Sequence, residues 1–294
     1  MTTPDSASSN PDVSPKVTAP LVRARKGGPP LTMVTAYDYP SARIADEAGI
    51  DIILVGDSVA NVVHGHAATI AVDIDTMVLH TAAVSRAQPR AMVVGDMPWL
   101  SYHISIEETI RNAGRLVREG GAEAVKLEGG RRRTEVVAAL VETEIPVMGH
   151  IGLTPQSVHA MGGYRVQGRM AEEARGLIDD ALALSEAGIF SLVLEGIPGL
   201  LAEIITKEIP VPTIGIGAGA GTDGQVLVFH DILGLSYGRK PRFVRRFADL
   251  HAAAVEGMRA FRHAVETGNF PAEEETYQLN DEVARQLLKE NRSD

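Results

Sequence analysis

Eight short apolar runs, separated by stretches with a different residue pattern, constrain what this chain can fold into more than any other feature. The runs cover residues 31–36, 51–55, 91–95, 122–127, 145–150, 190–194, 212–217 and 225–229. They are rich in β-branched residues and almost continuous, as expected of parallel strands buried on both faces. Most intervals, such as 105–121 and 171–188, have the period of an amphipathic helix. The pattern predicts an α/β protein with a single (β/α)8 TIM barrel.

A weak internal repeat supports this fold. Residues 47–57, 119–128 and 186–195 share one order of features: a helix ends at a glycine, the chain turns, and an apolar strand runs to an acid. A doubly wound sheet would show the same repeat. The barrel is favoured because no G-x-G-x-x-G motif follows the first predicted strand.

The two ends of the chain differ from the part between them. Residues 1–28 are rich in Ser, Thr, Pro and Asp and have no apolar period, so we expect a disordered N-terminal arm. Residues 247–266 and 281–291 have the pattern of extra C-terminal helices. The expected organisation is therefore an arm over 1–28 and a barrel domain over 29–294 that includes these helices.

Composition excludes several classes of function. The net charge is −10, with 28 basic and 38 acidic residues, which argues against a nucleic-acid partner because such binding depends on Lys and Arg at phosphates. There is no cysteine, so disulfides, thiol nucleophiles and Cys-ligated metals are excluded. No apolar run approaches the roughly 20 residues that a membrane span needs, and the N-terminus has no apolar signal core. We expect a cytoplasmic protein with no membrane partner.

Acidic residues stand where four of the predicted strands end: Asp57, Asp96, Glu128 and Glu195. In a barrel these strand ends meet on one face, where active sites are built. Any one of these acids could simply cap the following helix. Four together favour a cation site, because like charges at close range repel one another. Oxygen ligands select Mg²⁺, Mn²⁺ or Ca²⁺, and a site with few protein ligands and several waters suits Mg²⁺.

A lysine shares the fourth predicted strand with one of these acids. Lys126 lies two residues before Glu128, so both side chains point to the same side of the strand. A lysine inside a barrel requires a partner. It either forms a structural ion pair with Glu128 or anchors an anionic substrate, and we favour the anchor.

Several motifs resemble those of the ketopantoate hydroxymethyltransferase family, in order from about Leu31 to Leu250. They include VGDS (55–58), GDMPW (95–99), VKLEGG (125–130), GHIGLTPQSV (149–158), LVLEG (192–196) and TDGQVLVFHDILG (222–234). The resemblance implies a Mg²⁺-dependent barrel enzyme that transfers a hydroxymethyl group from 5,10-methylenetetrahydrofolate to 3-methyl-2-oxobutanoate. The product would be 2-dehydropantoate, for pantothenate and coenzyme A biosynthesis, formed through a Mg²⁺-stabilised enolate. The resemblance also implies a homodecamer.

The matching positions imply a role for each residue. Asp57, Asp96 and Glu128 resemble the family's Mg²⁺ ligands, and Asp57, Ser58, Asp96 and Lys126 match positions at the substrate. Glu195 matches the catalytic base. The family often has Cys after that Glu, where this chain has Gly196, and we expect this difference to affect packing rather than chemistry.

Two other functions stay open at this point. One is another Mg²⁺-dependent lyase that forms enolates from 2-oxo acids, of the isocitrate lyase type. Such enzymes typically carry a catalytic cysteine, which is absent here. The other is an oxo-acid-binding protein without activity, against which the complete set of four acids argues.

Overall fold

The computed structural model describes residues 15–238 and 240–290. These residues divide into two compact units. The first holds residues up to 232 together with 236–246, and the second holds 233–235 and the chain from 247 onward. The first unit contains the barrel and the candidate site.

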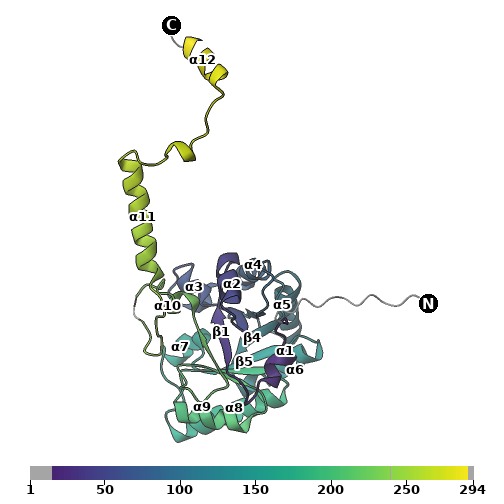
Figure 1. Ribbon diagram of the computed structural model, residues 1–294. Helices are drawn as coiled ribbons and strands as arrows, with labels where there is room; N and C mark the ends of the chain where they lie inside the picture. Colours follow the sequence, from purple (N-terminus) through teal and green to yellow (C-terminus); the bar gives the residue numbers. More distant parts are fainter. Residues whose placement is uncertain (1–14, 239, 291–294) are drawn as a thin grey trace, which may run out of the picture. The chain divides into compact units, whose positions relative to one another are not determined.

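The first unit is a closed barrel of eight parallel strands, with helices around it (Figure 1). Each strand pairs with the next in the sequence, and β8 pairs with β1. The strands are β1 (Leu31–Thr35), β2 (Ile52–Val55), β3 (Met92–Asp96), β4 (Ala124–Glu128), β5 (Val147–Gly152), β6 (Ser191–Glu195), β7 (Thr213–Ile216) and β8 (Gly224–Leu227). The sequence-based prediction of a (β/α)8 barrel is confirmed.

Helices connect most of the strands. They are α2 (Tyr39–Glu47), α3 (Val59–Val62), α4 (Ile74–Ser85), α5 (Ile106–Arg118), α6 (Thr134–Glu142), α7 (Val158–Met161), α8 (Ala171–Glu186), α9 (Gly199–Glu208) and α10 (Phe229–Ile232). The first unit also contains the short 3-10 helices η1 (Thr69–Ala71), η2 (Arg131–Arg133) and η3 (Pro155–Ser157). In α5 the Ser105 side chain accepts a hydrogen bond from the Glu108 backbone N–H, which satisfies one of the free donors of the first turn.

The connection from β7 to β8 has no helix among its residues 217–223. Gly219 adopts a positive φ of 76°, and a Cβ atom there would lie 3.0 Å from the Gly199 Cα at the start of α9. A side chain at this position would therefore clash with a neighbouring backbone. The glycines of this segment allow close backbone approach.

A helix near the N-terminus packs on the barrel interior. Val22 of α1 (Ala19–Ala24) is fully buried, and Val17, Ala19 and Val22 belong to the same apolar cluster as Leu31 and Ile52. Because Leu31 and Ile52 are the first residues of their strands, α1 covers the N-terminal end of the barrel. The expected disordered arm over 1–28 is therefore wrong for residues 15–28, and residues 1–14 lie outside the described part. The apolar residues of this segment are buried against the starts of the strands, and this contact could not be predicted from composition alone.

Polar contacts hold this segment to the strand starts. The Lys26 Nζ lies 2.9 Å from the Asp223 carboxylate, just before β8. The same carboxylate accepts hydrogen bonds from the backbone N–H groups of Gly27 and Thr213. Asp223 thus joins the N-terminal segment to two neighbouring strands.

The second unit contains α11 (Leu250–Glu266), the turn η4 (Glu273–Glu275) and α12 (Asp281–Glu290). The two helices agree with the sequence prediction. None of the residues described in α11 or α12 is buried. The prediction placed these residues in one domain with the barrel, whereas they form a separate compact unit. Over the described ranges, no helix is both long and apolar enough to cross a membrane.

Candidate functional site

The four predicted acids lie at the C-terminal ends of neighbouring strands. Asp96, Glu128 and Glu195 are the last residues of β3, β4 and β6, and Asp57 follows β2 closely. The strand register pairs Asp96 with Lys126, and Glu128 with His150 of β5. The fold therefore brings these residues to one face of the barrel, as expected from parallel strands.

Lys126 is buried and forms an ion pair, but with a different acid from the one considered in the sequence analysis. Its Nζ lies 2.9 Å from the Asp96 Oδ1, and both side chains are almost fully buried. The other Asp96 oxygen accepts a hydrogen bond of 3.0 Å from the Asp57 backbone N–H. Asp96 therefore links the ends of β2, β3 and β4.

His150 connects two of the acids. Its Nδ1 lies 3.4 Å from the Glu128 Oε1 and its Nε2 lies 3.2 Å from the Glu195 Oε2. Burial and the nearby Lys126 lower the pKa of His150, but hydrogen bonds and charges from Glu128 and Glu195 outweigh them and raise it to about 9. The imidazole therefore carries a positive charge at neutral pH.

Gln156 in η3 holds two of the predicted acids. Its side-chain Nε2 donates to the Asp57 Oδ2 at 2.9 Å, and its backbone N–H donates to the Glu128 Oε2 at 3.1 Å. The Tyr102 hydroxyl donates to its side-chain oxygen. Gln156 belongs to the GHIGLTPQSV motif, but no role was predicted for it from the sequence. The only signal available there was its place in the segment that follows β5.

Ser58 lies at the start of α3, next to Asp57. Its Oγ is 2.9 Å from the hydroxyl of the buried Tyr37. Burial raises the pKa of Tyr37, so this hydroxyl stays protonated at neutral pH. Tyr37, which was not predicted from the sequence, orients the Ser58 hydroxyl at the edge of the site.

Acidic side chains outnumber basic side chains in the site. Burial raises the pKa of Asp57, and the charges of Asp96 and Glu128 raise it further. Burial also raises the pKa of Asp96, against the effect of Lys126. Two cations, Lys126 and His150, face four carboxylates. The site as built favours an additional positive charge.

The chemistry of the donor set fits Mg²⁺. Three buried carboxylates, from Asp57, Asp96 and Glu128, present hard oxygen atoms in a region with excess negative charge. Among residues 15–238 and 240–290, no group of three or more His, Asp or Glu side chains is already arranged around one point. Each carboxylate is instead engaged by protein: Asp96 by Lys126, Asp57 by Gln156, and Glu128 by both Gln156 and His150. The ligand set stays a prediction.

Gly196, directly after Glu195, has a positive φ of 57°, and a Cβ atom there would lie 3.1 Å from the Leu153 Cβ. A larger residue would need Leu153 to shift. The position therefore affects packing beside the site.

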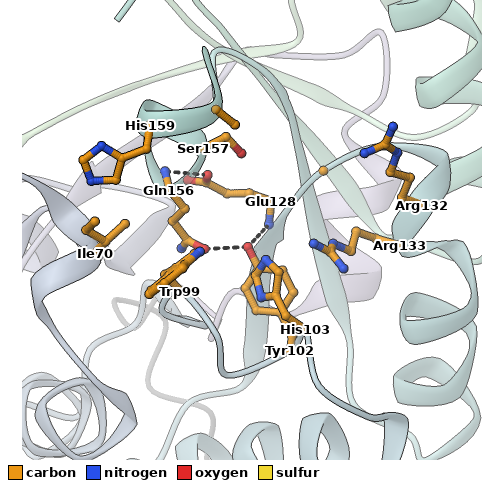
Figure 2. A pocket seen from close by; sticks show the side chains of 13 residues that line it. Ile70, Trp99, Tyr102, His103, Glu128, Arg132, Arg133, Gln156, Ser157 and His159 are labelled. Carbon is orange, nitrogen blue, oxygen red and sulfur yellow. Dashed lines mark hydrogen bonds between the residues drawn. The ribbon is translucent and has the colours of Figure 1, made fainter. Parts of the chain in front are cut away.

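A cavity of about 330 Å³ adjoins Glu128 and Gln156 (Figure 2). Its other walls come from the segments after β2, β3, β4 and β5, and include Trp99, His103, Arg133 and His159. The cavity gives a larger molecule access to Glu128.

Comparisons with known proteins agree first on the class of fold. The crystal structure of 2,3-dimethylmalate lyase, a member of the PEP mutase/isocitrate lyase superfamily, superposes with a TM-score of 0.56. It covers 95% of this chain and 97% of that chain, at 19% sequence identity. At this identity the likeness concerns the fold alone, and it defines the molecule as a TIM barrel of that architecture.

Sequence comparisons then identify the family. Residues 16–273 match the family described as ketopantoate hydroxymethyltransferase. The 3-methyl-2-oxobutanoate hydroxymethyltransferase of Syntrophomonas wolfei is 54% identical over 87% of this chain and 93% of the relative. The enzyme of that name from Pelobacter propionicus is 52% identical over 90% of this chain and 99% of the relative. The chain belongs to the ketopantoate hydroxymethyltransferase family.

Proposed function

We propose that this protein transfers a hydroxymethyl group from 5,10-methylenetetrahydrofolate to 3-methyl-2-oxobutanoate and forms 2-dehydropantoate. The observation that carries the proposal is the placement of Glu195 beside a buried cluster of three carboxylates and one lysine, all at the C-terminal face of the barrel. Such a site combines a base, a cation site and an anion anchor. These are the groups needed to form a carbon nucleophile from a 2-oxo acid.

The oxo acid is held through both of its polar groups, the carboxylate and the adjacent oxo group. Lys126 and Ser58 bind its carboxylate, and Asp57, Asp96 and Glu128 would hold a Mg²⁺ ion. When bound there, Mg²⁺ would polarise the oxo group of the substrate and so lower the pKa of the C3 proton. Asp96 already pairs with Lys126, which keeps the lysine charged and in position.

Glu195 removes the C3 proton of the bound oxo acid. The His150 Nε2, 3.2 Å from the Glu195 Oε2, orients the carboxylate before the transfer. The C3 carbanion bonds to the folate methylene carbon as one of the two C–N bonds of that carbon breaks. Water then replaces the second C–N bond and supplies the hydroxyl oxygen. Tetrahydrofolate leaves with both nitrogens protonated, one by the proton that Glu195 took from C3 and one by a proton from water.

Family membership favours this reaction over an isocitrate-lyase-type cleavage. The 2,3-dimethylmalate lyase resembles this chain in fold at 19% sequence identity. Relatives named 3-methyl-2-oxobutanoate hydroxymethyltransferase reach 54% sequence identity. The cytoplasm is the compartment that we propose, because a chain without cysteine gains no stability from an oxidising environment.

The test is a reconstitution with the purified protein, 3-methyl-2-oxobutanoate and 5,10-methylenetetrahydrofolate. We expect 2-dehydropantoate, detected by mass spectrometry, to accumulate with Mg²⁺, to stop after chelation and to resume when Mg²⁺ is restored. Each substrate should be required. Cleavage of a 2-hydroxy acid in place of transfer would support the lyase.

A further inference from the structure

The cavity beside Glu128 carries groups that the reaction described above does not use. Arg132 and Arg133 lie on one side of it, while Ile70 and His159 lie on the other (Figure 2). Trp99 and His103 form a further part of the wall. In the proposed reaction the oxo acid is small and its carboxylate binds to Lys126 and Ser58, which do not line this cavity. The cavity thus has room and charge for a second molecule.

The three consecutive arginines of η2 differ in their partners. Arg131 forms ion pairs with Asp180 at 2.9 Å and Asp179 at 3.4 Å. Within the described ranges, the guanidinium groups of Arg132 and Arg133 form no ion pair with a carboxylate. Arg133 lies 5.3 Å from the centre of the Tyr102 ring. Two guanidinium groups at a cavity wall, without protein carboxylates, are suited to binding an anion.

The aromatic groups of the wall indicate what else the ligand carries. The Trp99 ring is 41% exposed, which leaves a flat apolar surface free for stacking. The His103 Nδ1 is buried and has no hydrogen-bond partner among residues 15–238 and 240–290. Burial and the charge of Arg133 lower the pKa of His103 to about 4, so the ring is neutral at pH 7 and can donate or accept one hydrogen bond.

We infer that this cavity binds the folate co-substrate, with its glutamate carboxylates at Arg132 and Arg133 and its aromatic part against Trp99. The inference rests on the proposed function, since it names the position of that reaction's second substrate. The acidic end of the cavity, at Glu128, repels the anionic tail, and the arginines attract it. The ligand is therefore oriented with its one-carbon end toward the buried site.

Trp99 is the only tryptophan of the chain, so its fluorescence reports occupancy of this cavity directly. We expect tetrahydrofolate to quench it in a saturable way. Tetrahydropteroate, which lacks the glutamate, serves as the matched ligand. It should bind more weakly than tetrahydrofolate, by about tenfold, the scale of one charge-assisted hydrogen bond.

The variant that tests the arginines is Arg132→Gln with Arg133→Gln, and Arg131→Gln is its matched control. In the double variant the Kd for tetrahydrofolate and the KM for methylenetetrahydrofolate should both rise by about tenfold or more. The Kd for tetrahydropteroate should change much less. Arg131→Gln should keep native values, because that side chain is already paired. Metal-dependent exchange of the C3 proton of the oxo acid should continue in both variants, which also shows that they are folded.

The outcomes separate the two proposals. If the native chain performs the transfer and the double variant binds tetrahydrofolate with native affinity, the assignment of the arginines is wrong and the proposed function stands. If quenching occurs but is equal for both ligands, the glutamate tail lies elsewhere and the assignment is also wrong. If the native chain shows no folate-dependent transfer, the proposed function fails, and this inference fails with it.

Discussion

The individual residue that matters most to the proposed chemistry is Glu195, because it is the proposed base and its carboxylate lies 3.2 Å from the His150 Nε2. Glu195→Gln keeps the size and polarity of the side chain but cannot accept a proton at neutral pH. We expect native affinity for Mg²⁺ and oxo acid, and a loss of about 10²-fold or more in C3 proton exchange and in transfer, the scale of losing a positioned base. Deuterium incorporation followed by NMR measures the exchange. Exchange at the native rate would make His150 the next group to examine.

Asp96 is the acid whose loss should affect the metal most clearly. It is 1% exposed and joins Lys126 to the Asp57 backbone. Asp96→Asn should abolish activity and weaken Mg²⁺ binding, measured by calorimetry in the presence of oxo acid, while the circular dichroism stays native. The exposed Asp179→Asn is the control. Unchanged Mg²⁺ affinity in Asp96→Asn would remove Asp96 from the ligand set.

At the residue scale, the sequence predicted the acids better than the groups that hold them. Asp57, Asp96, Glu128 and Glu195 all follow buried strands, and strand ends in a barrel converge by geometry. Gln156 and Tyr37 gave no such signal, because their roles depend on how the segments after β5 and β1 return to the site. The ion-pair partner considered for Lys126, as the alternative to a substrate anchor, differs from the observed one for a related reason. Glu128 lies two residues away on the same strand, but the neighbouring strand places Asp96 within 2.9 Å.

Among the elements, α1 is the one whose contribution to stability is easiest to isolate. Val22 of α1 is fully buried, while Leu21, the preceding residue, is 48% exposed. Val22→Ala should lower the free energy of unfolding by about 2 kcal/mol, the scale of deleting two buried methyl groups and leaving part of a cavity. Leu21→Ala should change it by less than about 0.5 kcal/mol. Urea denaturation compares the two, and equal effects would mean that α1 is not docked on the barrel.

The strands and α1 show which elements a sequence reveals. All eight strands were predicted because burial on both faces leaves a short, continuous apolar run in each. Their predicted ends differ from the observed ones by at most two residues. The helix α1 was missed because it is six residues long and follows a stretch rich in Ser, Thr and Pro. Its stability comes from docking on the barrel interior rather than from its own pattern.

Asp223 gives the contact between the segment after α1 and the strands a dependence on pH, because its carboxylate binds Lys26 and Gly27. Burial opposes ionisation of this side chain, but hydrogen bonds from Thr213 and Lys26 outweigh it and lower its pKa. A carboxyl whose pKa is lower in the folded state stabilises the fold above its unfolded pKa of about 3.9, and loses this effect as the pH falls through the folded value. Asp223→Asn should therefore destabilise the protein at neutral pH. The difference from the native protein should shrink as the pH falls below about 4, measured by urea denaturation across that range.

For the whole molecule, the exposed apolar residues of the second unit bear on assembly. In α11, Met258, Phe261 and Val265 are 71%, 56% and 49% exposed. Their spacing of three and four residues places them on one face of the helix. Exposed apolar faces of this kind often mark surfaces that bind another protein. The face is a candidate contact within the homodecamer that we propose.

Sedimentation of the full chain tests that assembly. We expect a single species at about ten times the mass of one chain, consistent with closed ring symmetry. Replacing Met258 and Phe261 together by Glu places two charges on the apolar face, and should give a smaller species that keeps native circular dichroism. Glu256→Lys, on the opposite face of α11, is the matched control and should sediment like the native protein.

A native chain that sediments as a monomer would rule out the decamer. A charged double variant that stays assembled would show that the ring is held by the barrel unit, and α11 would then need another partner for its apolar face.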